Sequence, residues 1–279
     1  MKIDDGSKKT ICNYAFLKKF LKNGKSSSKY SVDQIRFCID NFSDCWKLWN
    51  QVRWDIAKEK NAGYSELKEY FGEEFKPYYD SSWAIAEKWV SLNPTTDEQI
   101  ANFYKKNIDY ISNLVIWHES GDRSITDDLL KKLVNKYNIQ SVIDFGCGVG
   151  TDGIRFEKLG LDVAYVDYDC PSIDFLKWRI QKNNLKGVIY NVETDFEYPS
   201  HDLFWAIDVL EHLPDPIKII EQIPQSTRLF VHRSMFNDTA FGRHPCHFNF
   251  DEGKLHKALE QEGFKLIEQG LLEIWQRKS

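Results

Sequence analysis

Apolar residues recur every three or four positions through roughly the first 120 residues, and this spacing predicts an all-helical N-terminal region. Helices are expected over residues 11–22, 31–42, 43–60, 80–92 and 96–117. Gly72 and Pro77 interrupt residues 64–79, so only one or two helical turns are expected there. The chain has nine tryptophans, and most of them lie in this region, which suits both a packed core and an aromatic pocket wall.

After residue 123 the pattern changes to short apolar runs that alternate with amphipathic segments. Strands are expected at residues 141–145, 162–167, 187–192, 202–208, 228–233, 264–269 and 271–277. Helices are expected at residues 150–159, 171–183, 215–223 and 251–262. This alternation predicts an α/β doubly wound sheet whose ligand crevice lies at the carboxyl ends of the strands. Only Gly270 separates the last two strands, so we expect an antiparallel hairpin at one edge.

The segment VIDFGCGVGTDGIRF, residues 142–156, joins the first of these strands to a helix. Gly146, Gly148 and Gly150 allow the backbone to turn tightly and leave room for a ligand beside it. Amide N–H groups at the start of the following helix would face that ligand. A strand, a glycine loop and a helix in this order indicate a nucleotide-type site.

The charges around the glycine loop favour one class of nucleotide. Glycines at the GxGxxG spacing of dinucleotide enzymes are present, but spacing alone is weak evidence. Asp144 and Asp152 flank the loop, and no Lys or Arg occurs between residues 141 and 154. Two carboxylates would repel a pyrophosphate, whereas S-adenosylmethionine carries a sulfonium and an ammonium and has no phosphate. The loop therefore suits S-adenosylmethionine better.

From about Ser141 onwards the chain resembles the class I S-adenosylmethionine-dependent methyltransferases. Four segments occur in the order typical of that family: residues 144–150 (DFGCGVG), 166–169 (VDYD), 202–213 (DLFWAIDVLEHL) and 262–267 (EGFKLI). The resemblance implies a Rossmann-like seven-stranded sheet with an antiparallel edge strand. It also implies S-adenosylmethionine as the cofactor and S-adenosylhomocysteine as the product. We therefore predict two domains: a helical N-terminal lid and substrate-recognition region over residues 1–123, and a methyltransferase domain over residues 124–279.

Asp167 is the sharpest prediction at residue level, because an acidic side chain at the end of the second strand can accept both ribose hydroxyls. By resemblance, Tyr168 would lie against the adenine face, and Asp144 would support the loop and the methionine ammonium. Asn191, Glu193 and Asp195 all compete for the adenine edge, with a preference for Glu193. The full set of predicted cofactor-binding residues is Asp144, Gly146, Cys147, Gly148, Gly150, Asp167, Tyr168, Glu193, Asp208 and Val209.

Methyl transfer needs a base only when the acceptor must lose a proton, and histidine is the usual base near neutral pH. His212 follows the fourth strand, His232 ends the fifth, and His118 ends the helical region, so these three are the candidate catalytic residues. The HPCH run at residues 244–247 is too tightly spaced for the usual paired metal ligands, and no second cluster accompanies it. We therefore expect no metal.

Net charge and sequence motifs limit the classes of methyl acceptor that the chain is expected to use. The formal net charge is −5 and the pI is about 5.9, so the chain lacks the basic footprint that nucleic-acid binding usually leaves. Nucleobase amino methyltransferases carry a DPPY-like run where this chain has Asp208-Val209-Leu210-Glu211. No apolar run is long enough to span a membrane, and the polar start MKIDDGSKKT is no signal peptide, so a cytoplasmic protein is expected.

The prediction that follows is methylation of a small-molecule acceptor at oxygen or nitrogen, with no nucleic-acid and no membrane partner. The sequence leaves the oligomeric state and the identity of the acceptor open. Three alternatives remain: an RNA or protein methyltransferase, a cofactor-binding module whose helical region docks a partner, and a nicotinamide-dependent dehydrogenase.

Overall fold

The computed structural model describes residues 3–23, 29–79, 81–123, 125–194, 198–236 and 245–278. The chain divides into two compact units. The first comprises Met1–Lys88 and Asp109–Ser124, and the second comprises Trp89–Ile108 and Ile125–Ser279. The single boundary predicted at residues 123 and 124 therefore differs from the observed division, because residues 89–108 belong with the second unit.

The first unit is helical throughout its described residues, as predicted. Its elements are α1 (Asp5–Ile11), α2 (Tyr14–Lys22), α3 (Val32–Asn41), α4 (Ser43–Lys60), α5 (Ala62–Phe71), the 3₁₀ turn η1 (Gly72–Glu74), most of α6 (Ser81–Leu92), and α8 (Asp109–Glu119). Ser31 and Gln34 form the capping box at the start of α3. The prediction of only one or two turns over residues 64–79 is wrong, because α5 is a regular helix that buries Leu67.

Side chains from α1 to α4 form one apolar core in this unit, with Trp49 almost fully buried in it. Asp122 is a buried charge of the same unit. It accepts hydrogen bonds from Arg36 (2.5 Å) and Trp49 Nε1 (3.3 Å), and the Arg53 guanidinium lies 3.6 Å away. Because a buried carboxylate is costly without such partners, this network ties the end of the unit to α3 and α4.

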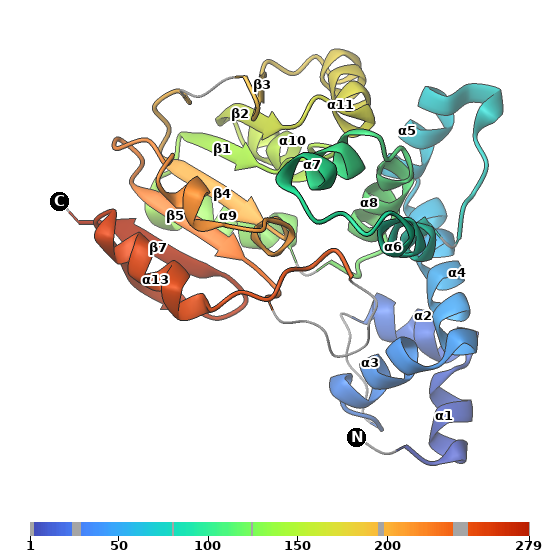
Figure 1. The fold of residues 1–279 in the computed structure, drawn as a ribbon. Helices are drawn as coiled ribbons and strands as arrows, with labels where there is room; N and C mark the ends of the chain where they lie inside the picture. Colours follow the sequence, from blue (N-terminus) through green and yellow to red (C-terminus); the bar gives the residue numbers. More distant parts are fainter. Residues whose placement is uncertain are drawn as a thin grey trace. The chain divides into compact units, whose positions relative to one another are not determined.

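The second unit contains a sheet of seven strands within the described residues (Figure 1). The strands are β1 (Ser141–Phe145), β2 (Asp162–Asp167), β3 (Val188–Asn191), β4 (Leu203–Ile207), β5 (Leu229–Arg233), β6 (Phe264–Gln269) and β7 (Glu273–Arg277). Their order is β3-β2-β1-β4-β5-β7-β6, and the first five run parallel. The β6–β7 hairpin lies at one edge, with β7 antiparallel to both β5 and β6. The predicted Rossmann-like sheet with its antiparallel edge hairpin is confirmed.

Alternate residues of the central strands point to opposite faces of the sheet, and each face has its own core. One face packs Val142, Tyr165 and Trp205 against residues of α9 (Asp127–Tyr137), α10 (Thr151–Lys158) and α11 (Pro171–Lys182). The other packs Phe204 and Phe230 against α12 (Ile217–Ile220) and α13 (Glu252–Gln261). Burial on both faces explains why the strands appear in the sequence as continuous apolar runs.

One long helix predicted over residues 96–117 is in fact two helices. The capping box of Thr96 and Gln99 begins α7 (Asp97–Lys105), as predicted, but the helix ends at Lys105 and α8 begins at Asp109. Asn107 between them is 1% exposed. The two helices are therefore separated at a buried asparagine, although the apolar spacing continues across it.

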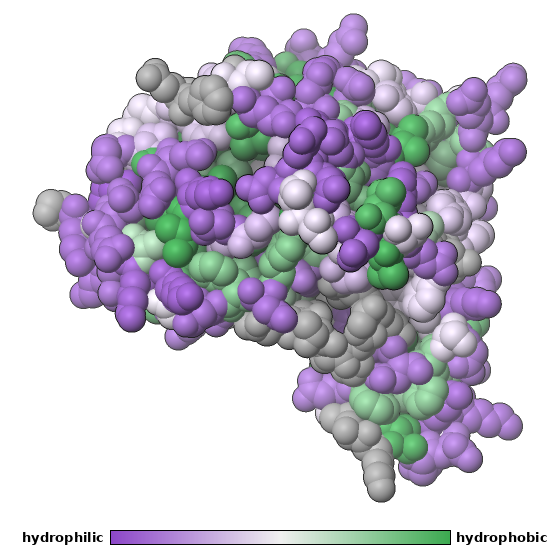
Figure 2. All heavy atoms as spheres, in the orientation of Figure 1, coloured by the Kyte–Doolittle hydropathy of each residue, from purple (hydrophilic) through white to green (hydrophobic). Residues whose placement is uncertain are grey.

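The surface drawn in Figure 2 is mainly hydrophilic, with apolar residues in separate patches. None of the helices in the described residues is long and apolar enough to cross a membrane.

Candidate active site

The glycine loop leaves the carboxyl end of β1 and leads into α10. Gly146, Gly148 and Gly150 have φ angles of 66°, 53° and 71°, in the left-handed region that favours glycine. The amides of Gly146 and Cys147 donate to the carbonyl of Val166 at 2.8 and 3.2 Å, which holds the loop against the end of β2. The loop predicted from the glycine spacing therefore has the tight turn that a close ligand contact requires.

Packing around the loop leaves no room for side chains at two of these glycines. A Cβ at Gly146 would lie 2.2 Å from Val209 Cγ2, and one at Gly150 would lie 2.2 Å from Leu176 Cδ1. Gly146 thus contacts Val209, which follows β4, and Gly150 contacts α11. The structure brings the predicted residues Gly146 and Val209 together.

Asp167 lies at the tip of β2 and faces the glycine loop. Its Oδ2 accepts a hydrogen bond from the Gly148 amide and its Oδ1 accepts one from the Tyr168 amide, both at 2.7 Å. Burial raises the pKa of the Asp167 carboxyl to about 6, although these two hydrogen bonds act in the opposite direction. Burial also raises the pKa of the Tyr168 hydroxyl and of the Cys147 thiol, so Cys147 lines the loop as a neutral side chain.

Asp144 and Asp152 are directed into the protein. Asp144 Oδ2 accepts from the Gly153 amide at 2.9 Å, and Asp152 Oδ2 accepts from Trp205 Nε1 at 3.0 Å. Both side chains are buried. Because each carboxylate accepts a hydrogen bond from within the protein, the two would repel a pyrophosphate less strongly than the sequence suggested.

Arg179 is a loop contact that sequence reasoning missed. Its Nη1 donates to the Val149 carbonyl at 2.6 Å, so a cation does reach the loop, from α11. Arg179 lies outside the segment of residues 141–154, which itself contains no Lys or Arg. The sequence signal for its burial was the position of Arg179 three residues after Leu176, on the apolar face of an amphipathic helix.

Asp208 follows β4 with a φ of 58°, which is unusual for a residue other than glycine. Its carboxylate is paired with Arg233 at the end of β5, with Arg233 Nε 2.8 Å from Oδ1 and a second hydrogen bond to Oδ2. Arg233 therefore already holds the carboxylate of Asp208, and the cofactor-binding role of Asp208 stays a prediction.

Helix α7 contacts the residues that follow β3 and β4. Lys105 Nζ lies 2.9 Å from Glu193 Oε1, and the Tyr104 hydroxyl lies 3.1 Å from His212 Nδ1. Figure 1 shows α7 at the end of the sheet toward which the β1 and β2 arrows point. Among the three candidates for the adenine edge, Asn191 accepts from the Glu193 amide at 2.9 Å, and Asp195 lies outside the described residues.

A family profile described as "Methyltransferase domain" matches residues 97–269, which is more than half of the chain. The chain belongs to this methyltransferase family. The match confirms the family and the S-adenosylmethionine cofactor predicted from the sequence. It also begins at the first residue of α7, so the methyltransferase domain includes a helix that the predicted boundary assigned to the lid.

No curated protein matches the methyltransferase, whereas many solved structures do. TehB from Haemophilus influenzae is 19% identical, with a TM-score of 0.44 over 58% of this chain and 66% of that one. An S-adenosylmethionine-dependent methyltransferase from Clostridium acetobutylicum is 10% identical, with a TM-score of 0.49 over 61% of this chain and 99% of that one. Magnesium protoporphyrin IX methyltransferase from Synechocystis is 15% identical, with a TM-score of 0.49 over 77% of this chain and 100% of that one.

The three histidines predicted as bases have different surroundings in the methyltransferase. His212 is in the 3₁₀ turn η2 (Leu210–His212) after β4, beside Tyr104. His232 is buried, and its Nε2 lies 3.1 Å from Glu273 Oε2, which His256 also contacts at 2.9 Å. Hydrogen bonding to His232 lowers the pKa of Glu273 to about 2. The contacts of Glu273 with His232 and His256 join β5, β7 and α13. His118 belongs to α8 of the first unit, and its catalytic role stays a prediction.

Glu211 is a buried carboxyl group that the sequence analysis did not single out. It is fully buried, and no described residue donates a hydrogen bond of ordinary geometry to either carboxylate oxygen. Burial, assisted by the nearby charge of Asp208, raises the pKa of Glu211 to about 8. Its position in an apolar run, between Leu210 and Leu213, was the available signal for burial.

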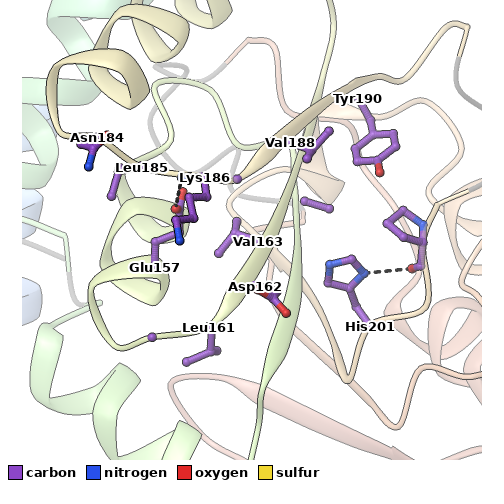
Figure 3. Close-up of a pocket in the computed structure, with 14 residues that line it drawn as sticks. Glu157, Leu161, Asp162, Val163, Asn184, Leu185, Lys186, Val188, Tyr190 and His201 are labelled. Atoms are coloured by element: carbon purple, nitrogen blue, oxygen red, sulfur yellow. Dashed lines mark hydrogen bonds between the residues drawn. The ribbon is translucent and has the colours of Figure 1, made fainter.

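A pocket of about 540 Å³ lies elsewhere in the same unit (Figure 3). Residues from the amino ends of β2 and β3 line it, at the opposite end of these strands from the glycine loop. Its Glu157 accepts from the Tyr165 hydroxyl and the Lys186 amide at 2.7 and 2.8 Å. Because the pocket lies away from the glycine loop and Asp167, we assign it no part in methyl transfer.

Proposed function

We propose that this methyltransferase transfers the methyl group of S-adenosylmethionine to an oxygen or nitrogen atom of a small-molecule acceptor. The observation that supports this acceptor class best is the position of α7. Through its contacts with Glu193 and His212, α7 lies against the residues that follow β3 and β4. A helix in this position would limit access to the carboxyl ends of the strands, which favours a small acceptor over a folded macromolecule.

Aromatic side chains support an acceptor with a flat or apolar part. The Trp89 ring centroid lies 4.9 Å from that of Phe103, 6.1 Å from that of Tyr104 and 6.0 Å from that of Phe248. Tyr104 in turn contacts His212, so this aromatic cluster adjoins the η2 turn. Rings of this kind offer a large contact area with few rotatable bonds.

Asp167 and the loop amides support the placement of the cofactor. The two oxygens of an ionised carboxylate offer about four acceptor sites, so Asp167 can accept from ribose hydroxyls while it keeps its contact with Gly148. Val209 packs on Gly146 and would border the methionine part of the cofactor. This assignment keeps Asp167, Gly146, Gly148 and Val209 in their predicted roles.

The transfer itself is an in-line displacement. The acceptor lone pair forms a bond to the methyl carbon, the sulfur–carbon bond breaks, and its electron pair stays on the sulfur of S-adenosylhomocysteine. Alignment of the two reactants supplies most of the rate enhancement. Of the predicted bases, His212 is best supported, because it follows β4 next to Val209 and contacts α7.

The acceptor class can be tested by following the methyl label. The full-length protein is incubated with methyl-labelled S-adenosylmethionine and a cell extract that has been separated into small molecules, RNA and protein. We expect label in the small-molecule fraction. Label in RNA or protein would support the alternative methyltransferase classes, and cofactor binding without transfer to any fraction would support a binding module.

Two variants of β2 serve as a matched pair in this test. Asp167→Ala removes the carboxylate that faces the loop, whereas Asp162→Ala removes an exposed carboxylate at the other end of the same strand. Transfer should be lost in Asp167→Ala and kept in Asp162→Ala. Equal transfer by both variants would contradict the proposed placement of the cofactor.

A further inference from the structure

His212, Cys246 and His247 form a compact cluster of metal-ligating groups. One ligand atom from each residue can be chosen so that all three lie within 4.8 Å of one another. Ligand atoms around a tetrahedral zinc ion are about 3.3–3.8 Å apart, given zinc–nitrogen and zinc–sulfur bonds of about 2.0–2.3 Å. Small side-chain rotations would therefore bring the three atoms to coordination distance.

The backbone holds the two segments of the cluster together. The Phe248 amide donates to the Glu211 carbonyl at 2.7 Å, so the residue after His247 is bonded to the residue before His212. The two imidazole rings have centroids 4.6 Å apart and an interplanar angle of 78°. Backbone pairing beside the ligands is what a preorganised site requires.

The contacts of His212 Nδ1 are of the kind that orient a metal-ligating histidine. Its Nδ1 lies 3.3 Å from the Cys246 carbonyl oxygen, which can only accept a hydrogen bond. A proton on Nδ1 would therefore be donated to this carbonyl oxygen. The Tyr104 hydroxyl, 3.1 Å from the same Nδ1, can accept as well. Metal-ligating histidines typically donate their second nitrogen to such a partner, which fixes the orientation of the ring.

We propose that His212, Cys246 and His247 bind a zinc ion. Two imidazoles and one thiolate suit zinc among the common divalent metals, and three protein ligands leave a fourth position open, as in catalytic zinc sites. No metal was predicted from the sequence, because the HPCH run alone is too tightly spaced to supply the usual paired metal ligands. The fold supplies the missing ligand, His212, from the turn after β4. His244 lies outside the described residues and is not part of the proposed set.

The open position gives the metal a role in methyl transfer, and this part rests on the proposed function. In that position zinc would act as a Lewis acid and lower the pKa of an acceptor hydroxyl, so that the hydroxyl proton would pass to water more readily. The oxygen lone pair then forms the bond to the methyl carbon as S-adenosylhomocysteine leaves with the sulfur electron pair. As a zinc ligand, His212 would not be the base; water would accept the proton instead.

Cobalt substitution tests the site through its spectrum. The full-length protein is treated with a chelator, then titrated with Co²⁺ and, separately, with Zn²⁺. We expect one ion per chain and a thiolate-to-cobalt charge-transfer band. Cys246→Ser should lose that band, and His212→Gln and His247→Gln should each weaken Zn²⁺ binding more than about tenfold. The controls Cys12→Ser and His201→Gln, which change residues outside the cluster, should bind as the wild type does.

Several outcomes would overturn the site. These are no stoichiometric binding by the wild type, a charge-transfer band that survives Cys246→Ser, or equal affinity in the histidine variants and the controls. S-adenosylmethionine binding shows whether each variant is folded, and the two histidine variants are independent of each other. Tyr104→Phe should weaken zinc binding less than either ligand variant.

Methyl-transfer assays with and without zinc distinguish failure of the metal's role from failure of the proposed function. Loss of methyl transfer on zinc removal, with its return on zinc addition and unchanged cofactor affinity, supports both proposals. Transfer that is unaffected by zinc removal overturns the activating role and leaves the proposed function intact. Zinc binding by a protein that methylates no small molecule overturns the proposed function and leaves the metal site standing.

Discussion

Gly146 is constrained in two independent ways, by its backbone angle and by the Val209 side chain. Gly160 shares only the first constraint, since it has a φ of 90° but open space where a Cβ would lie. Gly160→Ala should therefore cost about 1–2 kcal/mol of folding free energy, the usual penalty for a left-handed residue with a side chain. Gly146→Ala should cost clearly more, because its Cβ would overlap Val209 Cγ2. Urea unfolding of both variants measures the difference, and equal losses would contradict the packing.

The pKa of Asp167 predicts how cofactor binding depends on pH. In the folded protein this pKa is about 6, above its ordinary value of 3.8. The raised pKa means that Asp167 adds stability below about pH 4, and that this contribution is lost as pH rises through about 6. Cofactor binding should follow the opposite course, because ribose hydroxyls need the ionised carboxylate.

We therefore expect affinity for S-adenosylmethionine to be about tenfold weaker at about pH 5 than at about pH 7.5. Fluorescence or calorimetric titration at both pH values gives the ratio. Asp167→Asn should bind weakly at both, with little change between them. A wild-type affinity that is the same at both pH values would mean that Asp167 does not contact the cofactor.

Residue types and spacing identified the glycines and Asp167 because a tight loop and a strand-end carboxylate are local features. The directions of Asp144 and Asp152 were not visible in the sequence, since their donors are an amide within α10 and the indole of Trp205. Arg179 was missed for a related reason. A buried arginine differs from an exposed one only by which face of its helix is covered.

Strands β4 and β5 end in an ion pair that links their carboxyl ends. Asp208 and Arg233 have side chains that are 8% and 15% exposed, so the loss of one partner leaves a charge largely shielded from water. Arg233→Gln should destabilise the protein by about 3 kcal/mol or more. Asp208→Asn combined with Arg233→Gln should recover part of that loss, because no unpaired charge remains. Thermal unfolding of the single and double variants tests this, and strictly additive losses would contradict a coupled pair.

The strands were predictable because β1, β2 and β6 are continuous apolar or alternating runs with clear ends, and their predicted bounds match the observed ones. Helix breaks in the N-terminal half were harder to predict. The division between α7 and α8 falls at the buried Asn107, and α5 continues up to Gly72. Local propensity could not show either effect, since tertiary packing decides both.

The assignment of residues 89–108 to the second unit is a property of the whole molecule. It depends on contacts between residues far apart in the sequence: Tyr104 and His212 are separated by 108 positions, and Lys105 and Glu193 by 88. The same holds for the cluster of His212, Cys246 and His247. No single sequence shows which distant side chains meet, so the division between the two units and the meeting of these three side chains both required the structure.

The proposed methyl-transfer function depends on whether the loop between β1 and α10, together with Asp167, binds S-adenosylmethionine. Calorimetric titration of the wild type, Asp167→Ala and Asp162→Ala with S-adenosylmethionine tests this most directly, with NADH as the competing ligand. If Asp167 binds the ribose as proposed, Asp167→Ala removes two charge-assisted hydrogen bonds, each worth about 1.5–3 kcal/mol. We predict that the wild type and Asp162→Ala bind S-adenosylmethionine alike, that Asp167→Ala binds it well over tenfold more weakly, and that none binds NADH. Equal affinity in all three proteins, or binding of NADH in place of S-adenosylmethionine, would contradict the account.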